Sequence, residues 1–289
     1  MKKSKIKLFE LGRVSLAKTS RPVLDGYLCP LCLRLFADLD GLSEEHVPPS
    51  SIGGKAICLT CTRCNNVAGH SIDSALFREQ KLSQFLAEEG PPTRVRVSHG
   101  ELSLNCEIQD RAGTIEIRAL PRQNDPKVEA AMQQVFESSD ISRLEFHVTA
   151  YGGYRSADAD VAYLKSAYLG AFAKFGYTWL FGVDTNPIRR QIVHYNSMIL
   201  PSYRFAINPE APTELADGFY FMKTPFVAVM TVIQKYALLL PWAGGPNTAG
   251  ISEWLSEQRS ISLTGKLSFV HYAPWPTTSE FALDSGRLP

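Results

Sequence analysis

The sequence lacks an uninterrupted apolar run of the about 20 residues that a helix needs to cross a bilayer. Its most apolar late stretch, residues 226–242, is interrupted by Gln234 and Lys235 and therefore predicts buried structure. The lysines at the start lead into Phe9 and Glu10 without the continuous apolar core of a secretory signal. These features predict a cytoplasmic protein without a membrane partner.

The chain also lacks an excess of charge of either sign. Among 289 residues, 30 Lys and Arg face 29 Asp and Glu, so the net charge is +1 and indicates no strongly anionic partner. Residues 1–25 depart from this mean, because before Asp25 they contain seven basic residues and one acidic residue, Glu10. The basic residues are Lys2, Lys3, Lys5, Lys7, Arg13, Lys18 and Arg21. Such a basic lead-in is either an arm that lies along phosphates or a solvated, partly disordered tail.

There is no internal repeat and no low-complexity tract, and one clear break divides the chain. Residues 26–89 form a compact module, and Gly90-Pro91-Pro92 interrupts any helix. Residues 93–289 are then a larger α+β domain with antiparallel strands. We expect an antiparallel meander over 93–118 and helices over 126–136 and from Asp158 or Asp160 to Phe175, the second ending at Gly176. Further strands are expected over 144–150, 218–222, 228–239 and 261–271, and irregular structure over 274–289.

Cysteine is scarce, yet four of the six cysteines are paired. The two pairs are Cys29-Pro30-Leu31-Cys32 and Cys61-Thr62-Arg63-Cys64. In a reducing compartment two such pairs predict one structural zinc ion rather than disulfides. Cys58 and Cys106 are expected to be small core residues.

The segment between the two pairs must have a structure of its own, because it is 28 residues long. We expect a strand over 41–47, a loop over 48–54 and a returning strand over 55–59. Cys61 then leads into a helix that carries Cys64, Asn65 and Asn66. The first strand contains Glu45-His46, and the loop contains Gly53-Gly54.

Taken together, these motifs resemble the HNH endonuclease family, whose site is the ββα-metal (treble-clef-like) fold. The resemblance covers about residues 26–80 and is carried, in order, by Cys29-x-x-Cys32, Glu45-His46-x-x-Pro49, Gly53-Gly54 and Cys61-x-x-Cys64-Asn65. It implies hydrolysis of DNA phosphodiester bonds, with His46 as the base that deprotonates a water. It also implies that Glu45 and Asn65 hold a catalytic ion, and oxygen ligands suit Mg²⁺ or Mn²⁺.

The sequence departs from the family pattern in two places. The family has an Asn near the start of the second strand, where this chain has Lys55-Ala56-Ile57, and its acid is more often Asp than Glu. Adjacent strand residues point to opposite faces, so Glu45 and His46 share one site only where the strand ends or bulges. His70 is either an additional ion ligand or a surface histidine.

The leading functional prediction is a metal-dependent endonuclease, with phage defence or restriction suggested by the resemblance alone. Lys2, Lys3, Lys5, Lys7 and Arg63 are predicted to contact nucleic acid, and the sequence does not separate DNA from RNA. Residues 93–289 are expected to position substrate, sense a ligand, or bind a protein partner or a second copy. The alternative is a zinc-finger binding module with a degenerate nuclease site, in which His46 is structural and Glu45 pairs with Lys55.

Overall fold

The computed structural model describes residues 3–19, 25–86, 92–111, 114–138, 147–150, 156–201, 203–207, 215–234, 236–258 and 267–281. The chain divides into two compact units. Unit 1 joins Met1–Ser74 to Ala157–Pro289, and unit 2 is the intervening stretch Ala75–Ser156. This division differs from the break expected at residues 90–92, because the chain returns to unit 1 after leaving it. Gly90 and Pro91 themselves lie outside the described residues.

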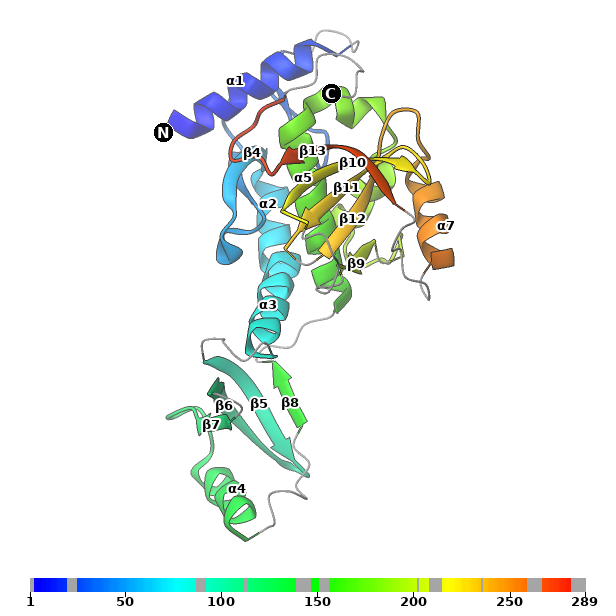
Figure 1. Ribbon diagram of the computed structural model, residues 1–289. Helices are drawn as coiled ribbons and strands as arrows, with labels where there is room; N and C mark the ends of the chain where they lie inside the picture. Colours follow the sequence, from blue (N-terminus) through cyan, green and yellow to red (C-terminus); the bar gives the residue numbers. More distant parts are fainter. Residues whose placement is uncertain are drawn as a thin grey trace. The chain divides into compact units, whose positions relative to one another are not determined.

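The basic lead-in is helical where it is described. Helix α1 (Lys3–Ala17), the blue helix of Figure 1, buries Leu8, Phe9 and Leu16. Gly12 lies against the ring of Tyr27 so closely that a Cβ there would meet a ring carbon at 2.2 Å. The disordered tail is therefore wrong for this stretch, because its apolar residues have a surface to cover. Lys2 and Arg21 lie outside the described residues.

Residues 25–73, here called the N-terminal module, contain two short hairpins and a helix. Strands β1 (Tyr27–Leu28) and β2 (Leu35–Phe36) form the first hairpin. Strand β3 (Leu42–Val47), the 3₁₀ turn η1 (Ser50–Ile52) and strand β4 (Lys55–Cys61) form the second, which is antiparallel. The chain continues as α2 (Thr62–Ala68), the π-helix η2 (Gly69–Asp73) and α3 (Ser74–Leu86). The strand, loop, strand and helix that the sequence predicted are thus present in that order.

The structure favours glycine at positions 53 and 54 for two different reasons. Gly53 has a φ of 88°, in the left-handed region that favours glycine. Gly54 lies against the loop backbone, where a Cβ would meet the carbonyl oxygen of Pro48 at 1.4 Å. A side chain at Gly54 would therefore force the loop between β3 and β4 apart.

The later part of unit 1 is a sheet with helices against it (Figure 1). The strands run in the order β13 (Ser268–Pro274), β10 (Gly218–Thr224), β11 (Ala228–Ile233), β12 (Tyr236–Pro241) and β9 (Arg204–Ala206), with helices α5 (Ser156–Gly182), α6 (Asn186–Val193) and α7 (Thr248–Gln258). The single strand expected over 228–239 is wrong, because the chain turns at Gln234, whose φ is 56°. The strand expected over 261–271 is shifted to β13, and residues 261–266 lie outside the described ones.

Helix α5 is buried nearly all round, because the sheet and the N-terminal module both cover it. Its Phe175 ring packs edge-on against Phe219, Phe221 and Trp242 of the sheet. Gly176, with a φ of 72°, breaks the helix at the position where its end was expected. The other sides of α5 meet the N-terminal module, so α5 connects the module to the sheet.

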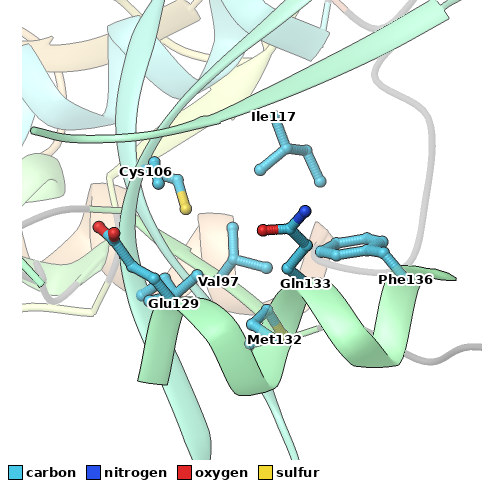
Figure 2. Close-up of a pocket in the computed structure, with 9 residues that line it drawn as sticks. Val97, Cys106, Ile117, Glu129, Met132, Gln133 and Phe136 are labelled. Atoms are coloured by element: carbon cyan, nitrogen blue, oxygen red, sulfur yellow. The ribbon is translucent and has the colours of Figure 1, made fainter. Parts of the chain in front are cut away.

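Unit 2 has a sheet in the order β7 (Thr114–Ala119), β6 (Leu102–Arg111), β5 (Thr93–His99) and β8 (His147–Ala150), with helix α4 (Pro126–Ser138) on it. The expected meander and helix are confirmed. A pocket of about 240 Å³ lies between α4 and the sheet (Figure 2), with Cys106, Glu129 and Gln133 as the polar members of its lining. Taken over both units, the described fold mixes helices with antiparallel strands.

No helix among the described residues combines the length and the apolar character required to span a bilayer.

Candidate functional site

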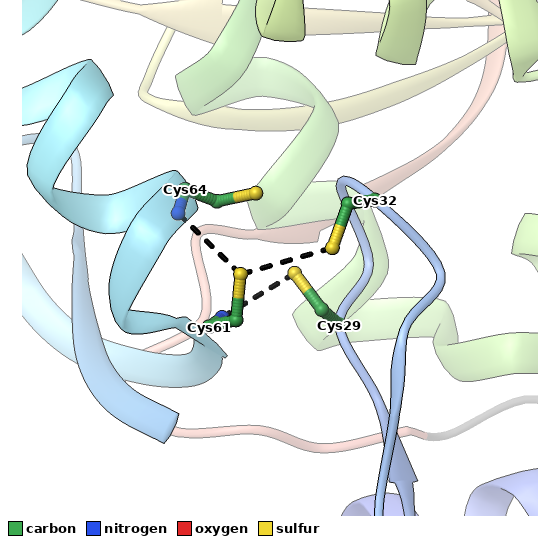
Figure 3. A group of neighbouring side chains, drawn as sticks. All are labelled: Cys29, Cys32, Cys61 and Cys64. Carbon is green, nitrogen blue, oxygen red and sulfur yellow. Dashed lines mark hydrogen bonds between the residues drawn. The ribbon is translucent and has the colours of Figure 1, made fainter. Parts of the chain in front are cut away.

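Four cysteines from three elements converge in the N-terminal module (Figure 3). Cys29 and Cys32 belong to the turn after β1, Cys61 ends β4, and Cys64 lies in the first turn of α2. All four sulfurs are within 4.8 Å of one another, and those of Cys32 and Cys61 are 3.7 Å apart. A tetrahedral zinc with Zn–S bonds of about 2.3 Å separates its sulfurs by about 3.8 Å. The cluster therefore has the dimensions of a metal site.

The thiols of this cluster also favour a bound cation. Backbone N–H groups of Cys61 and Cys64 donate to the sulfurs of Cys29 and Cys61 at 3.3 and 3.4 Å. The hydrogen bond with Cys29 lowers the pKa of Cys61 to about 6, whereas the hydrogen bonds with Cys32 and Cys61 raise the pKa of Cys29. Four thiols this close cannot all ionise unless a positive ion balances them. The cluster can thus hold a metal ion such as zinc.

Helices α5 and α6 hold the turn that carries Cys29 and Cys32. The hydroxyl of Tyr168 donates to the carbonyl oxygen of Pro30 at 2.7 Å, and that of Tyr177 donates to Leu28. Arg189 of α6 donates to the carbonyl oxygen of Leu31 at 3.4 Å. Sequence reasoning missed these donors, because they lie more than a hundred residues away from the turn in the chain.

Glu45 and His46 lie near the end of β3 and differ in burial. The ladder with β4 shifts register between these two residues, so the strand irregularity required for a shared site is present. Their side chains nevertheless point apart: Glu45 is 2% exposed, whereas His46 is exposed to solvent. Among the described residues, no hydrogen bond to the His46 ring is found, and Trp275 supports this strand end by donating to the carbonyl oxygen of Val47 at 3.3 Å.

Glu45 is part of a buried ionic cluster, here called the Lys165 cluster. The Lys165 ammonium lies 2.8 Å from Oε1 of Glu45 and 2.7 Å from Oδ2 of Asp73, and Thr60 donates its hydroxyl to Oε2 of Glu45 at 2.7 Å. Burial lowers the pKa of Lys165, but Glu45 and Asp73 outweigh burial and raise it above its ordinary value, so the ammonium stays charged. The pairing of Glu45 with Lys55 is therefore wrong.

Lys165 is the residue of this region that sequence reasoning missed. It is 1% exposed and stands in a helical run of small, aliphatic and aromatic residues. A lysine in such a run is almost never fully buried unless it is paired. That lone charge was the available signal, although the sequence does not reveal which acids it would meet.

The other predicted residues are distributed around the hairpin of β3 and β4. Asn65 donates from Nδ2 to Ser43 Oγ at 2.9 Å and to the Glu44 carbonyl oxygen at 3.0 Å, so it lies beside the part of β3 that precedes Glu45. His70 and Arg63 are exposed, whereas Asp73 turns inward to Lys165.

The lysines of α1 lie beside the same strand. A hydrogen bond from Ser4 to Glu44 fixes the first turn of α1 next to β3, two residues before His46. Lys3 and Lys7 are exposed there, and Lys5 donates to the carbonyl oxygen of Leu39 at 3.1 Å. The structure thus brings α1, Asn65 and the end of β3 into one region.

The predicted ligands fit a catalytic divalent ion only in part. The oxygen Oδ1 of Asn65 accepts no hydrogen bond from the described residues and is a suitable hard ligand. Both oxygens of Glu45 have partners, and an ion beside Lys165 would be repelled by its charge. As placed here, Glu45 does not fit the ion.

Comparison with known proteins identifies the N-terminal module. Residues 29–81 match the family model described as HNH endonuclease. The match begins at the first cysteine of the cluster and extends through the hairpin of β3 and β4 into α3. Searches of the curated proteins and of the solved structures found no match. The likeness to the HNH endonuclease family therefore rests on residues 29–81.

Proposed function

We propose that this protein is a metal-dependent endonuclease that hydrolyses phosphodiester bonds of DNA. The observation that carries the proposal is the coincidence of the HNH match at 29–81 with the cysteine cluster and the hairpin of β3 and β4. Phosphodiester hydrolysis needs a base for the attacking water and charge neutralisation at the phosphate.

His46 is the proposed base. Its ring is exposed at the end of β3, where the phosphate backbone of DNA can reach it. Histidine is the side chain whose ordinary pKa suits proton transfer near neutral pH. The neutral ring would take the proton of the attacking water, while Trp275 and the buried face of β3 keep the strand end in place.

Two metals have separate proposed roles. Zinc at the four cysteines is structural, because four thiolates leave no open position for a water. A bound Mg²⁺ or Mn²⁺ would neutralise charge on the phosphate and on the leaving oxygen. Asn65 would hold that ion through Oδ1, and the exposed His70 is a further candidate ligand.

The proposal is tested with supercoiled plasmid and the zinc-loaded full chain, dialysed free of other ions. We expect nicked and linear products with Mg²⁺ or Mn²⁺ and none without an added ion. Single-stranded DNA and RNA of one sequence, offered in parallel, show which nucleic acid is cut. Cleavage that is unchanged without added ion would contradict metal dependence.

The lysines of α1 are proposed phosphate contacts. Changing Lys3 and Lys7 together to alanine should weaken DNA binding and reduce the slope of log K against log salt by about 2, one unit for each lost contact. The matched control is Lys127→Ala with Lys223→Ala, which removes the same charge from exposed positions elsewhere. Equal loss of affinity in both double variants would contradict a local role for α1.

A zinc-stabilised binding module without nuclease activity is the second candidate. Its support is the pairing of Glu45 with Lys165, together with the absence of Asn near Ala56. It predicts that the plasmid is bound but never cut.

A role in phage defence or restriction rests on the family resemblance. Docking of a protein partner or second copy through the C-terminal segment also stays a prediction, although Phe269, Val270 and Tyr272 are exposed on the edge strand β13.

A further inference from the structure

The Lys165 cluster joins β3 to helix α5, with Lys165 lying 120 residues after Glu45 in the chain, and Glu45 directly precedes the proposed base. Glu45 belongs to β3, Asp73 ends η2, and Lys165 belongs to α5. The side chain of Lys165 is 1% exposed and that of Glu45 is 2% exposed, so neither can touch DNA. Whatever these groups contribute, they contribute it through the backbone that presents His46.

We propose that Lys165 is a positioning residue, the permanent counter-ion that holds Glu45 behind the end of β3, and that Glu45 is not a ligand of the catalytic ion. The inference rests on the proposed nuclease function. It assigns to α5, which lies outside the segment 29–81, a part in the geometry of the site.

Three observations support a permanent pair. The ammonium stands between two carboxylates at 2.8 and 2.7 Å, the place that a divalent cation would otherwise take. Thr60, which is itself fully buried, donates to the other oxygen of Glu45 at 2.7 Å. The helix carrying Lys165 is packed on all sides, so the ammonium cannot withdraw without moving α5.

The geometry also explains what the pair would position. Glu45 is the residue directly before His46, at the register shift of the hairpin. Fixing the Glu45 side chain on the buried face fixes the backbone there, and His46, the next residue, is exposed. The His46 ring is thereby directed outward, although no hydrogen bond from a described residue holds it.

The first measurement is Mn²⁺ binding to the zinc-loaded full chain, followed by electron paramagnetic resonance. We expect Glu45→Gln to bind Mn²⁺ within about twofold of the wild type, whereas Asn65→Ala binds it at least about tenfold more weakly. Glu45→Gln weakening binding as much as Asn65→Ala would overturn the inference. A wild type that binds no Mn²⁺ and cuts no DNA contradicts the proposed function instead, and the stability measurement then decides on Lys165.

That second measurement is a double-mutant cycle in denaturant. Lys165→Met leaves two buried carboxylates without their cation, so it should destabilise the fold strongly, and adding Glu45→Gln should recover part of the loss. We expect a coupling of at least about tenfold in the folding equilibrium constant. The control is Lys174→Met on the same helix, whose partner Glu280 is partly exposed. Additive effects of Lys165→Met and Glu45→Gln would overturn the pair.

The third measurement separates positioning from stability. The double variant Glu45→Gln with Lys165→Met, compared at a temperature at which it is folded, should show a lower kcat for plasmid cleavage with unchanged KM and unchanged Mn²⁺ affinity. A merely structural pair would leave kcat at the wild-type value in the folded double variant, and that result would contradict a positioning role.

Discussion

The variant His46→Ala is expected to cleave DNA about 10² to 10⁴ times more slowly than the wild type, the usual range for the loss of a general base. DNA binding should stay within about twofold, because the proposed phosphate contacts come from lysines and not from the imidazole. The measurement is single-turnover cleavage of a linear duplex beside a filter-binding titration of the same duplex.

The matched control for His46→Ala is His147→Ala, which removes a likewise exposed histidine from unit 2. It should cut like the wild type. Undiminished cutting by His46→Ala, in protein shown free of contaminating nuclease, would refute the mechanism. Loss of both cutting and binding would instead mean that the substitution disturbs the hairpin of β3 and β4.

The variant Cys64→Ser is expected to lose the metal and to unfold the N-terminal module. A structural zinc site contributes about 10 to 16 kcal/mol of apparent binding free energy at neutral pH, which matches or exceeds the whole stability of a typical domain. The measurement is zinc content together with a thermal melt followed by circular dichroism.

Cys106→Ser supplies the comparison for Cys64→Ser, because Cys106 is buried in unit 2 and lies outside the cluster. It should keep full zinc content and show only the modest loss of a core substitution. A Cys64→Ser protein with native helix content, native melting and stoichiometric zinc would show that the cluster is not a structural zinc site.

Local patterns predicted the parts of the fold that local chemistry determines. Three features depend on neighbours only a few residues away: the two Cys-x-x-Cys pairs, the strand pattern around Glu45 and the Gly53-Gly54 turn. The structure has β3, η1, β4 and α2 at these positions. The turn at Gln234 was missed, because a positive φ at a residue other than glycine carries no reliable sequence signal.

Long-range pairing explains what the sequence did not predict. The sequence of Lys3–Ala17 predicts a basic arm, whereas in the structure Tyr27 packs against it. The sequence likewise predicts Glu45 as an ion ligand, whereas in the structure it pairs with Lys165. The insertion of unit 2 within unit 1 is of the same kind. Composition changes near residue 90, but only the return of α5 to the N-terminal module shows where the compact units divide.

The support of the cysteine turn by Tyr168 and Tyr177 has a consequence during synthesis of the protein. These hydroxyls lie 138 and 149 residues after the carbonyl groups that they bond. At translation rates of about 5 to 20 residues per second, the turn waits roughly 7 to 30 s on the ribosome before its supports emerge. During that interval a bound metal ion such as zinc can hold the four cysteines together, so nascent chains made under metal limitation should be the most exposed to proteolysis and oxidation.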